Sequence, residues 1–165
     1  MRTRRGQSFV ELAAGLIVVI PVVLLCIDIA TIYLGVELNS TVCRDAARAA
    51  SLGAPDAITS GEPKRRAEGV VRKANKTAGA VRLDPNVQVS ENVNQANLPT
   101  APFGGPIEGD VTVETSVHIY PPFLLSCIAH QSGLKFTTNQ TFAYTWTMAN
   151  TSTAPGQSNQ GSRQY

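Results

Sequence analysis

The residues best placed to do chemistry lie near the N-terminus, in the order Gly6, Gln7 and Glu11. Glu11 stands at the start of a long apolar segment, and a carboxylate near the edge of a bilayer is costly and is usually retained for a partner or a task. Cutting the chain after Gly6 would supply that partner, because the new α-amino group of Gln7 is cationic at neutral pH. The two groups cannot readily meet within one straight helix. We therefore expect the amine of one subunit to pair with Glu11 of a neighbour shifted along its axis.

A second group of reactive side chains lies in the last third of the chain, at His118, Cys127 and His130. A cysteine three residues from a histidine could be a thiol–imidazole pair or part of a metal site, but a zinc site needs about four well-spaced ligands. We therefore expect no catalytic site, no bound metal and no cofactor. The chain is not expected to be an enzyme.

The segment that carries Glu11 is long enough to cross a membrane. Residues Leu12–Ile27 contain no charge, and after Asp28 the apolar run continues to Val36. About 23 helical residues at ~1.5 Å each reach roughly 35 Å, against a hydrocarbon core of about 30 Å. Residues 2–5 include three arginines, and basic residues beside a span tend to stay in the cytoplasm. The pattern predicts one span of the inner membrane, with the N-terminus cytoplasmic and the rest of the chain exported.

Other interpretations of this N-terminus are less favoured. A cleaved secretory peptide has an apolar core of only about 7–15 residues and a small-residue cleavage site, which is not evident here. Arg4-Arg5 lacks the large apolar residues that follow the pair in a twin-arginine signal, and Leu25 is too large to precede a lipoprotein cysteine at Cys26. An uncleaved single-span anchor, carrying a periplasmic or surface domain that binds a ligand or partner, remains the alternative.

The string Gly6-Gln7-Ser8-Phe9-Val10-Glu11, followed by an apolar span, resembles the processing site of type IV pilins. Asp28 late in the span, the alanine- and arginine-rich segment Cys43–Ala50 and two strands around Tyr120-Pro121-Pro122 are similar to the TadE-like family of minor pilins, or pseudopilins, of Flp-type (Tad) type IV pili. The similarity covers most of residues 4–147. Leu12 stands where that family usually has an aromatic residue.

This resemblance implies cleavage between Gly6 and Gln7 by an inner-membrane prepilin peptidase. It also implies a role in pilus assembly, initiation or adhesion. The implied partners are the peptidase, other pilin subunits, the Tad inner-membrane assembly machinery and membrane lipid, with the protein reaching the extracellular pilus after assembly.

Asp28 has two interpretations. Deep in the outer half of the span, its carboxyl could pair with another subunit or with a membrane component of the assembly machinery. Alternatively, it could stay protonated or reach the interface. Pro21 in the same segment could either kink the helix or simply be tolerated.

Beyond the span, the pattern predicts an α+β fold. Small or apolar residues at 35, 38, 42, 46 and 49 extend the long N-terminal helix outside the membrane to about Ser51. A second short amphipathic helix is expected from Pro63 to Ala78, with a basic face that could meet anionic lipid or an acidic partner, or could simply be solvated. Alternating apolar residues predict a small antiparallel sheet of about three strands, at 81–89, 111–120 and 134–148.

The chain is therefore expected to comprise a cleaved leader (1–6), the transmembrane part of the first helix (7–36), an exported pilin-like domain (37–148) and a disordered tail (149–165). The net charge is only +2 and the basic residues are not concentrated on one face, so nucleic acid is not expected as a partner.

Three details of the exported part stay open. A disulfide between Cys43 and Cys127 would fasten the long helix to the sheet, but it requires Cα atoms within about 7 Å. The alanines of Cys43–Ala50 could allow close approach of another helix or pack on their own domain. The apolar residues Phe123–Leu125 could cover the sheet or dip toward the membrane.

Overall fold

The computed structural model describes residues 4–75, 79–94, 106–129, 133–147 and 162–164. The chain forms three helices and five strands within these ranges. In chain order they are α1 (Arg4–Ser51), α2 (Glu62–Ala74), β1 (Val81–Leu83), β2 (Gln88–Val93), β3 (Ile107–Ile119), α3 (Ser126–Ala129), β4 (Leu134–Thr147) and β5 (Ser162–Gln164). The predicted α+β class is confirmed.

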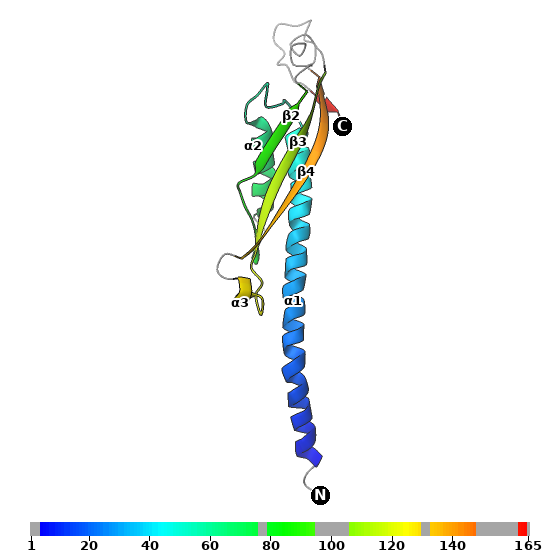
Figure 1. The fold of residues 1–165 in the computed structure, drawn as a ribbon, viewed down its shortest axis with the longest axis vertical. Helices are drawn as coiled ribbons and strands as arrows, with labels where there is room; N and C mark the ends of the chain where they lie inside the picture. Colours follow the sequence, from blue (N-terminus) through cyan, green and yellow to red (C-terminus); the bar gives the residue numbers. More distant parts are fainter. Residues whose placement is uncertain (1–3, 76–78, 95–105, 130–132, 148–161, 165) are drawn as a thin grey trace.

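Helix α1 dominates the shape, because only its C-terminal half packs on the rest of the domain (Figure 1). It continues through Pro21 without a break, so the proline is accommodated inside the helix. The helix ends at Ser51, two residues before Gly53, which adopts a φ of 89°. Glycine reaches this left-handed conformation without the steric penalty of a Cβ, so the chain can turn back toward α2.

One face of α1 is buried, and it begins at Asp28. From there, buried or half-buried residues recur every three or four positions, which is one face of an α-helix. The predicted stripe is correct at Gly35, Val42 and Ala46. Leu38 is exposed beside the buried Asn39, and Ala49 is half-buried beside the fully buried Ala50. The fully buried alanines 46, 47 and 50 pack on the chain's own domain.

The sheet is antiparallel and larger than the three strands expected. β3 lies in its middle, with β4 on one side and both β1 and β2 on the other. The single strand predicted over 81–89 is divided because Pro85 has no N–H to donate and the Asp84 side chain accepts from Asn86 N–H at 2.9 Å. β3 also begins at Ile107, four residues before the start of the strand expected at 111–120.

The expectation of a disordered tail is wrong for Ser162–Gln164. These residues form β5, which pairs with Thr145–Thr147 at the end of β4. The low-complexity composition gave no apolar signal for this strand, but ladder hydrogen bonds are made by the backbone and need none. Residues 148–161 lie outside the described ranges.

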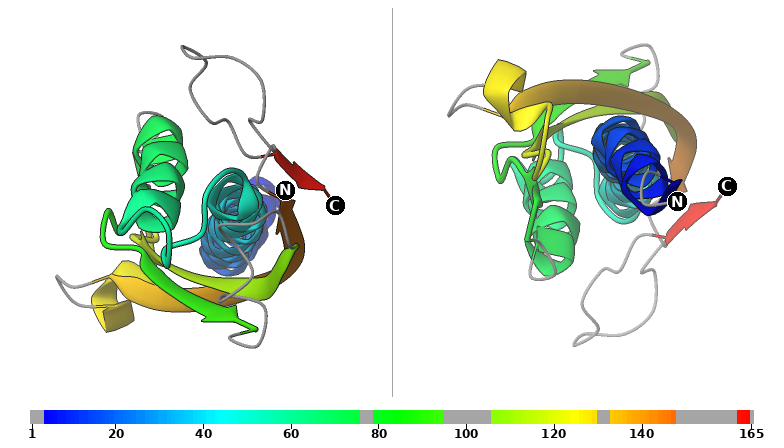
Figure 2. Two further views of the ribbon diagram at one scale, coloured as in Figure 1. Left: turned by 90° about the horizontal axis from the view of Figure 1, so that it is seen from above. Right: turned by 90° about the horizontal axis from the view of Figure 1, so that it is seen from below.

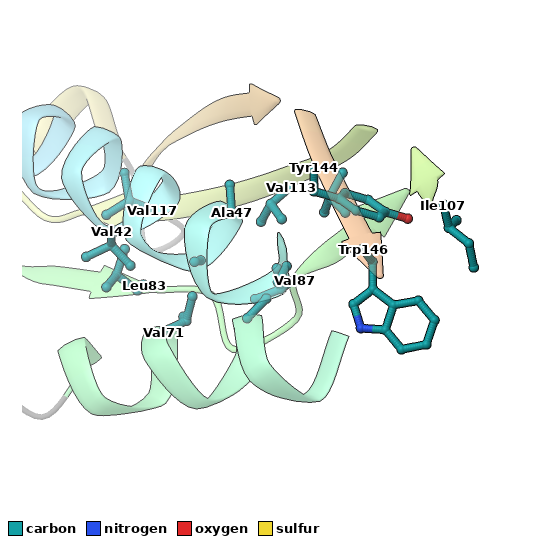
Figure 3. Close-up of a cluster of buried hydrophobic side chains, with 14 of the residues drawn as sticks. Val42, Ala47, Val71, Leu83, Val87, Ile107, Val113, Val117, Tyr144 and Trp146 are labelled. Carbon is teal, nitrogen blue, oxygen red and sulfur yellow. The ribbon is translucent and has the colours of Figure 1, made fainter. Parts of the chain in front are cut away.

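The sheet curves around α1, and α2 lies beside α1 on the same concave side (Figure 2). The core between them is mostly valine and alanine. Figure 3 shows Val42 and Ala47 of α1 among three valines of the same cluster, which are Val71 of α2 and Val113 and Val117 of β3. The long helix is thereby fixed to the sheet over its second half.

Helix α2 is shorter than predicted, ending at Ala74 instead of Ala78. The Asn75 side chain ends it by donating to Leu83 O at 2.9 Å and accepting from Leu83 N–H at 3.2 Å, which ties the helix end to β1. Ala67 and Val71 of the predicted apolar face are buried. On the basic face, Arg65 pairs with Glu62 at 2.7 Å in solvent. Such exposed pairs are typical of a solvated helix surface.

Candidate assembly site on helix α1

The N-terminal half of α1 is an exposed apolar cylinder. The helix is long and apolar enough to cross a membrane, and only 6% of its most apolar 18-residue stretch is buried. A core helix of a soluble domain would be mostly buried, so this exposure suggests a membrane anchor or a signal sequence. Phe9, Leu16, Ile20 and Val23 are among the large side chains that it exposes.

The predicted processing site lies in the first turns of this cylinder. Gly6 and Gln7 are helical in the backbone, and Glu11 follows about one turn later on the same helix. The Glu11 side chain is exposed among apolar neighbours, and no partner for it is found among the side chains that the structure describes. Its pairing with the Gln7 amine of another subunit stays a prediction.

Asp28 binds its own chain through two backbone N–H groups. Its side chain is completely buried, with Oδ1 accepting from Phe123 N–H at 3.0 Å and Oδ2 accepting from Leu125 N–H at 2.8 Å. Both oxygens are thus occupied by the segment that connects β3 to α3. The pairing with another subunit or a membrane component is not tested by these contacts and stays a prediction. Hydrogen bonds to a carboxylate are each worth about 1.5–3 kcal/mol.

Asn39 continues the polar side of the buried stripe, eleven residues after Asp28. It accepts from Thr115 Oγ1 at 2.9 Å and donates to Thr138 Oγ1 at 3.1 Å. The Asn39 side chain therefore joins α1 to β3 and β4 at once. Sequence reasoning missed this role, although an asparagine at helical spacing from Gly35 and Cys43 was a signal that a polar group lies in the interface.

Cys43 comes one turn later and faces the same two strands. Its Sγ is buried and lies 3.3 Å from both Val113 O and Thr138 O, so the thiol donates into the seam between β3 and β4. Burial raises the pKa of the Cys43 thiol, since a thiolate would lose its hydration there.

The Cys43–Cys127 disulfide is not formed, and both cysteines are free. Cys127 belongs to α3, two residues after Leu125, which binds Asp28. Asp28 and Cys43 are fifteen residues apart on a straight helix, or about 22 Å at ~1.5 Å per residue. This separation exceeds the Cα distance of about 7 Å that a disulfide can bridge.

The other reactive side chains are not brought together in the part of the chain that the structure describes. His118 lies on β3, beside an open cleft of about 810 Å³ lined also by Asn75, Arg82 and Asp84, whereas Cys127 is exposed on α3. His130 lies outside the described ranges. Among the described residues, no three His, Cys, Asp or Glu side chains are grouped so that they could hold a metal ion.

No protein-family model matches this chain, and neither a curated protein nor a solved structure matches it significantly. The architecture itself is that of a long apolar N-terminal helix packed against a small antiparallel sheet. This arrangement is consistent with a type IV pilin-like fold.

Proposed function

We propose that this chain is a minor pilin, or pseudopilin, of a Flp-type (Tad) type IV pilus, similar to the TadE-like family. It is made as a single-span protein of the inner membrane with its N-terminus in the cytoplasm. A prepilin peptidase cuts it between Gly6 and Gln7, and the mature protein takes part in pilus assembly, initiation or adhesion. Its role is structural, without catalysis or a cofactor.

The observation that carries this proposal is the change of surroundings along α1 at Asp28. After Asp28, one face of the helix packs on its own domain, whereas from Phe9 to Ile27 every apolar side chain except the half-buried Leu24 is exposed. An apolar surface of this size needs an apolar environment. Lipid supplies it while the protein is in the membrane, and the helices of neighbouring pilin subunits supply it after extraction into a filament.

Glu11 gives this process a direction. Within the exposed half of α1 the residues from Phe9 to Ile27 include one ionisable carboxylate, Glu11. In a bundle of such helices it would be costly without a cation, which the Gln7 amine of the next subunit provides after cleavage. The Tad inner-membrane machinery and other pilin subunits are the partners of this step, and nucleic acid is not one of them.

The cleavage is tested by expressing the full chain with its cognate prepilin peptidase and sequencing the N-terminus of the product. We expect the product to begin at Gln7, and Gly6→Leu to remain uncut. Gly15→Leu is the matched control, since a side chain added at Gly15 meets nothing within 4 Å. An intact Met1 in the presence of active peptidase would refute the proposal and favour the permanently anchored binding domain.

The pairing is tested separately, by replacing Glu11 with alanine. Glu11→Ala should still insert and be cut, but it should be lost from sheared pili. Glu37→Ala is the control, because Glu37 is an exposed glutamate of the same helix beyond the apolar half. Equal amounts of both variants in the pilus fraction would show that the Glu11 carboxylate is not needed for assembly.

A further inference from the structure

The connection between β3 and α3 is an apolar loop, residues 121–125, fastened to the side of α1. Its backbone N–H groups at Phe123 and Leu125 donate to Asp28, at 3.0 and 2.8 Å. Its side chains at Phe123 and Leu124 are left exposed. The carboxylate thus satisfies the polar backbone of the loop and leaves an apolar tip. Figure 1 shows α3 beside α1, below the end of the sheet nearest the N-terminus.

The position of Asp28 gives the depth of this loop along α1. Asp28 comes 17 residues after Glu11, which is about 26 Å of helix at ~1.5 Å per residue, and the hydrocarbon core of a bilayer is about 30 Å thick. With Glu11 at the cytoplasmic boundary, Asp28 and the loop lie at the outer boundary, so the span ends eight residues before the Val36 expected from the sequence. The loop is also continuous with the apolar surface of α1, where Leu25 and Ile29 are exposed.

A row of basic residues lies just above the loop. Arg82, His118 and Lys135 are cross-strand neighbours on β1, β3 and β4, one residue from the strand ends. The strand end at Ile119 is level with Gly35, where an added Cβ would lie 2.5 Å from Ile119 Cδ1. Gly35 is about 10 Å further along α1 than Asp28, a distance at which long basic side chains can reach lipid headgroups.

Tyr120 joins the basic row to the apolar loop. Its ring lies 5.6 Å from the Arg82 guanidinium carbon, and its backbone leads directly into the loop. Tyrosine is enriched at the membrane–water interface, where its ring is at the level of the headgroups. Apolar tip, tyrosine and basic row therefore follow one another in the order in which a membrane changes from hydrocarbon to water.

We propose that the loop held by Asp28 enters the outer face of the membrane beside α1, with Phe123 and Leu124 in the hydrocarbon boundary and the basic row against anionic headgroups. The occupant of this surface is lipid. The exported domain is then attached to the membrane at two places and has a fixed orientation on it. This inference rests on the membrane anchorage in the proposed function, but not on the pilus.

The test uses the full chain in vesicles of phosphatidylcholine and phosphatidylglycerol, with and without bromine on the acyl chains, which quenches nearby tryptophan. Leu124→Trp is the probe. Leu52→Trp is the matched control, since both leucines are 42% exposed and Leu52 lies at the far end of α1. Val19→Trp reports the span. The native Trp146 is buried in the sheet and supplies the baseline.

We expect quenching of Leu124→Trp to reach at least about half of that of Val19→Trp, as for a group at the acyl boundary, and quenching of Leu52→Trp to stay at the baseline. Quenching of Val19→Trp alone would overturn the inference and leave the anchor intact. An absence of quenching at Val19→Trp would overturn the anchorage as well. Phe123→Trp is a second probe of the same loop.

The tether is tested by adding Asp28→Leu to the Leu124→Trp chain. The leucine side chain removes both acceptors, so quenching should fall to the level of Leu52→Trp. Asp28→Asn keeps one acceptor oxygen and should lose only part of the signal. Quenching that persists unchanged in Asp28→Leu would show that Asp28 does not hold the loop at the membrane.

Discussion

The hydrogen bond between Asn39 and Thr115 joins α1 to the sheet, and its contribution to the free energy of unfolding can be predicted. Thr115 is 1% exposed, and its hydroxyl donates to Asn39 Oδ1 at 2.9 Å. Asn39→Leu has a similar shape but leaves this buried hydroxyl without an acceptor, at a cost of about 1–3 kcal/mol. The bond to Thr138 Oγ1 at 3.1 Å is also lost, and a typical hydrogen bond contributes about 1 kcal/mol. Asn39→Leu should therefore lower the free energy of unfolding by about 2–4 kcal/mol, a large share of the 5–15 kcal/mol of an ordinary domain.

Thr115→Val removes the donor of the same hydrogen bond and leaves Asn39 Oδ1 without this donor. When both partners are replaced, no unsatisfied group remains in that bond, so the double variant should cost less than the sum of the single variants by about 1–3 kcal/mol. Urea unfolding of the full chain in detergent micelles, followed by Trp146 fluorescence, measures all four free energies. Asn139→Leu is the control, since Asn139 is exposed on β4, and should change stability by less than about 0.5 kcal/mol.

Additive costs for Asn39→Leu and Thr115→Val would refute this reasoning. Additivity within about 0.5 kcal/mol is the behaviour of independent sites. It would mean that the two side chains do not depend on each other, and that the apolar contacts of α1 alone hold it on the sheet.

Two further predictions concern Cys43 and Gly109. Burial raises the pKa of the Cys43 thiol above its ordinary 9.0, so the folded chain holds this proton more tightly than the unfolded chain. That stability is complete below pH 9.0 and is lost as the pH rises through the raised pKa, so urea midpoints should fall more steeply above pH 9.0 in the parent chain than in Cys43→Ala. A Cβ at Gly109 would lie 2.7 Å from Asn92 O and 2.9 Å from Tyr144 Oη, so Gly109→Ala should cost about 1–3 kcal/mol in the same assay, whereas Gly15→Ala should not destabilise the chain.

Much of the fold could be predicted from the sequence because its signals are local. The uncharged run over Leu12–Ile27 identifies an exposed helix, and alternation identifies β3 and β4. The break between β1 and β2 at Pro85 and the last residue of α2 were harder to predict. Both depend on which backbone groups of a neighbouring strand are free to form hydrogen bonds. Asn75 ends the helix by binding Leu83, a contact that exists only once β1 has formed.

The candidate site was less predictable, because its contacts join distant parts of the chain. The partners of Asp28 are 95 and 97 residues away, so neither spacing nor composition could indicate them. The predicted disulfide between Cys43 and Cys127 was wrong because the distance between the two residues cannot be read from the sequence. The sequence has two thiols beyond the apolar segment, which was compatible with a disulfide, but α3 and Cys43 lie at different levels along α1. The role of Asn39 was not predicted, because the helical spacing of apolar residues could be satisfied equally well by its neighbour Leu38. A single polar residue at that point of the stripe therefore did not stand out as a buried position.

The bond between Asp28 and the loop also fixes a rotation. With about 100° of turn per residue, the 17 residues from Asp28 back to Glu11 place the two carboxylates about 100° apart around the α1 axis. Because Asn39 and Cys43 hold the second half of the helix on the sheet, Glu11 has a fixed direction around the α1 axis relative to the sheet. Viewed along the α1 axis, Glu11 lies on the side of the helix, neither toward the sheet nor directly away from it. Deleting one residue between Glu11 and Asp28 would turn this direction by about 100° while shortening the helix by only ~1.5 Å. In the proposed filament, the direction in which a subunit meets its neighbour is therefore encoded in the residue count of the helix.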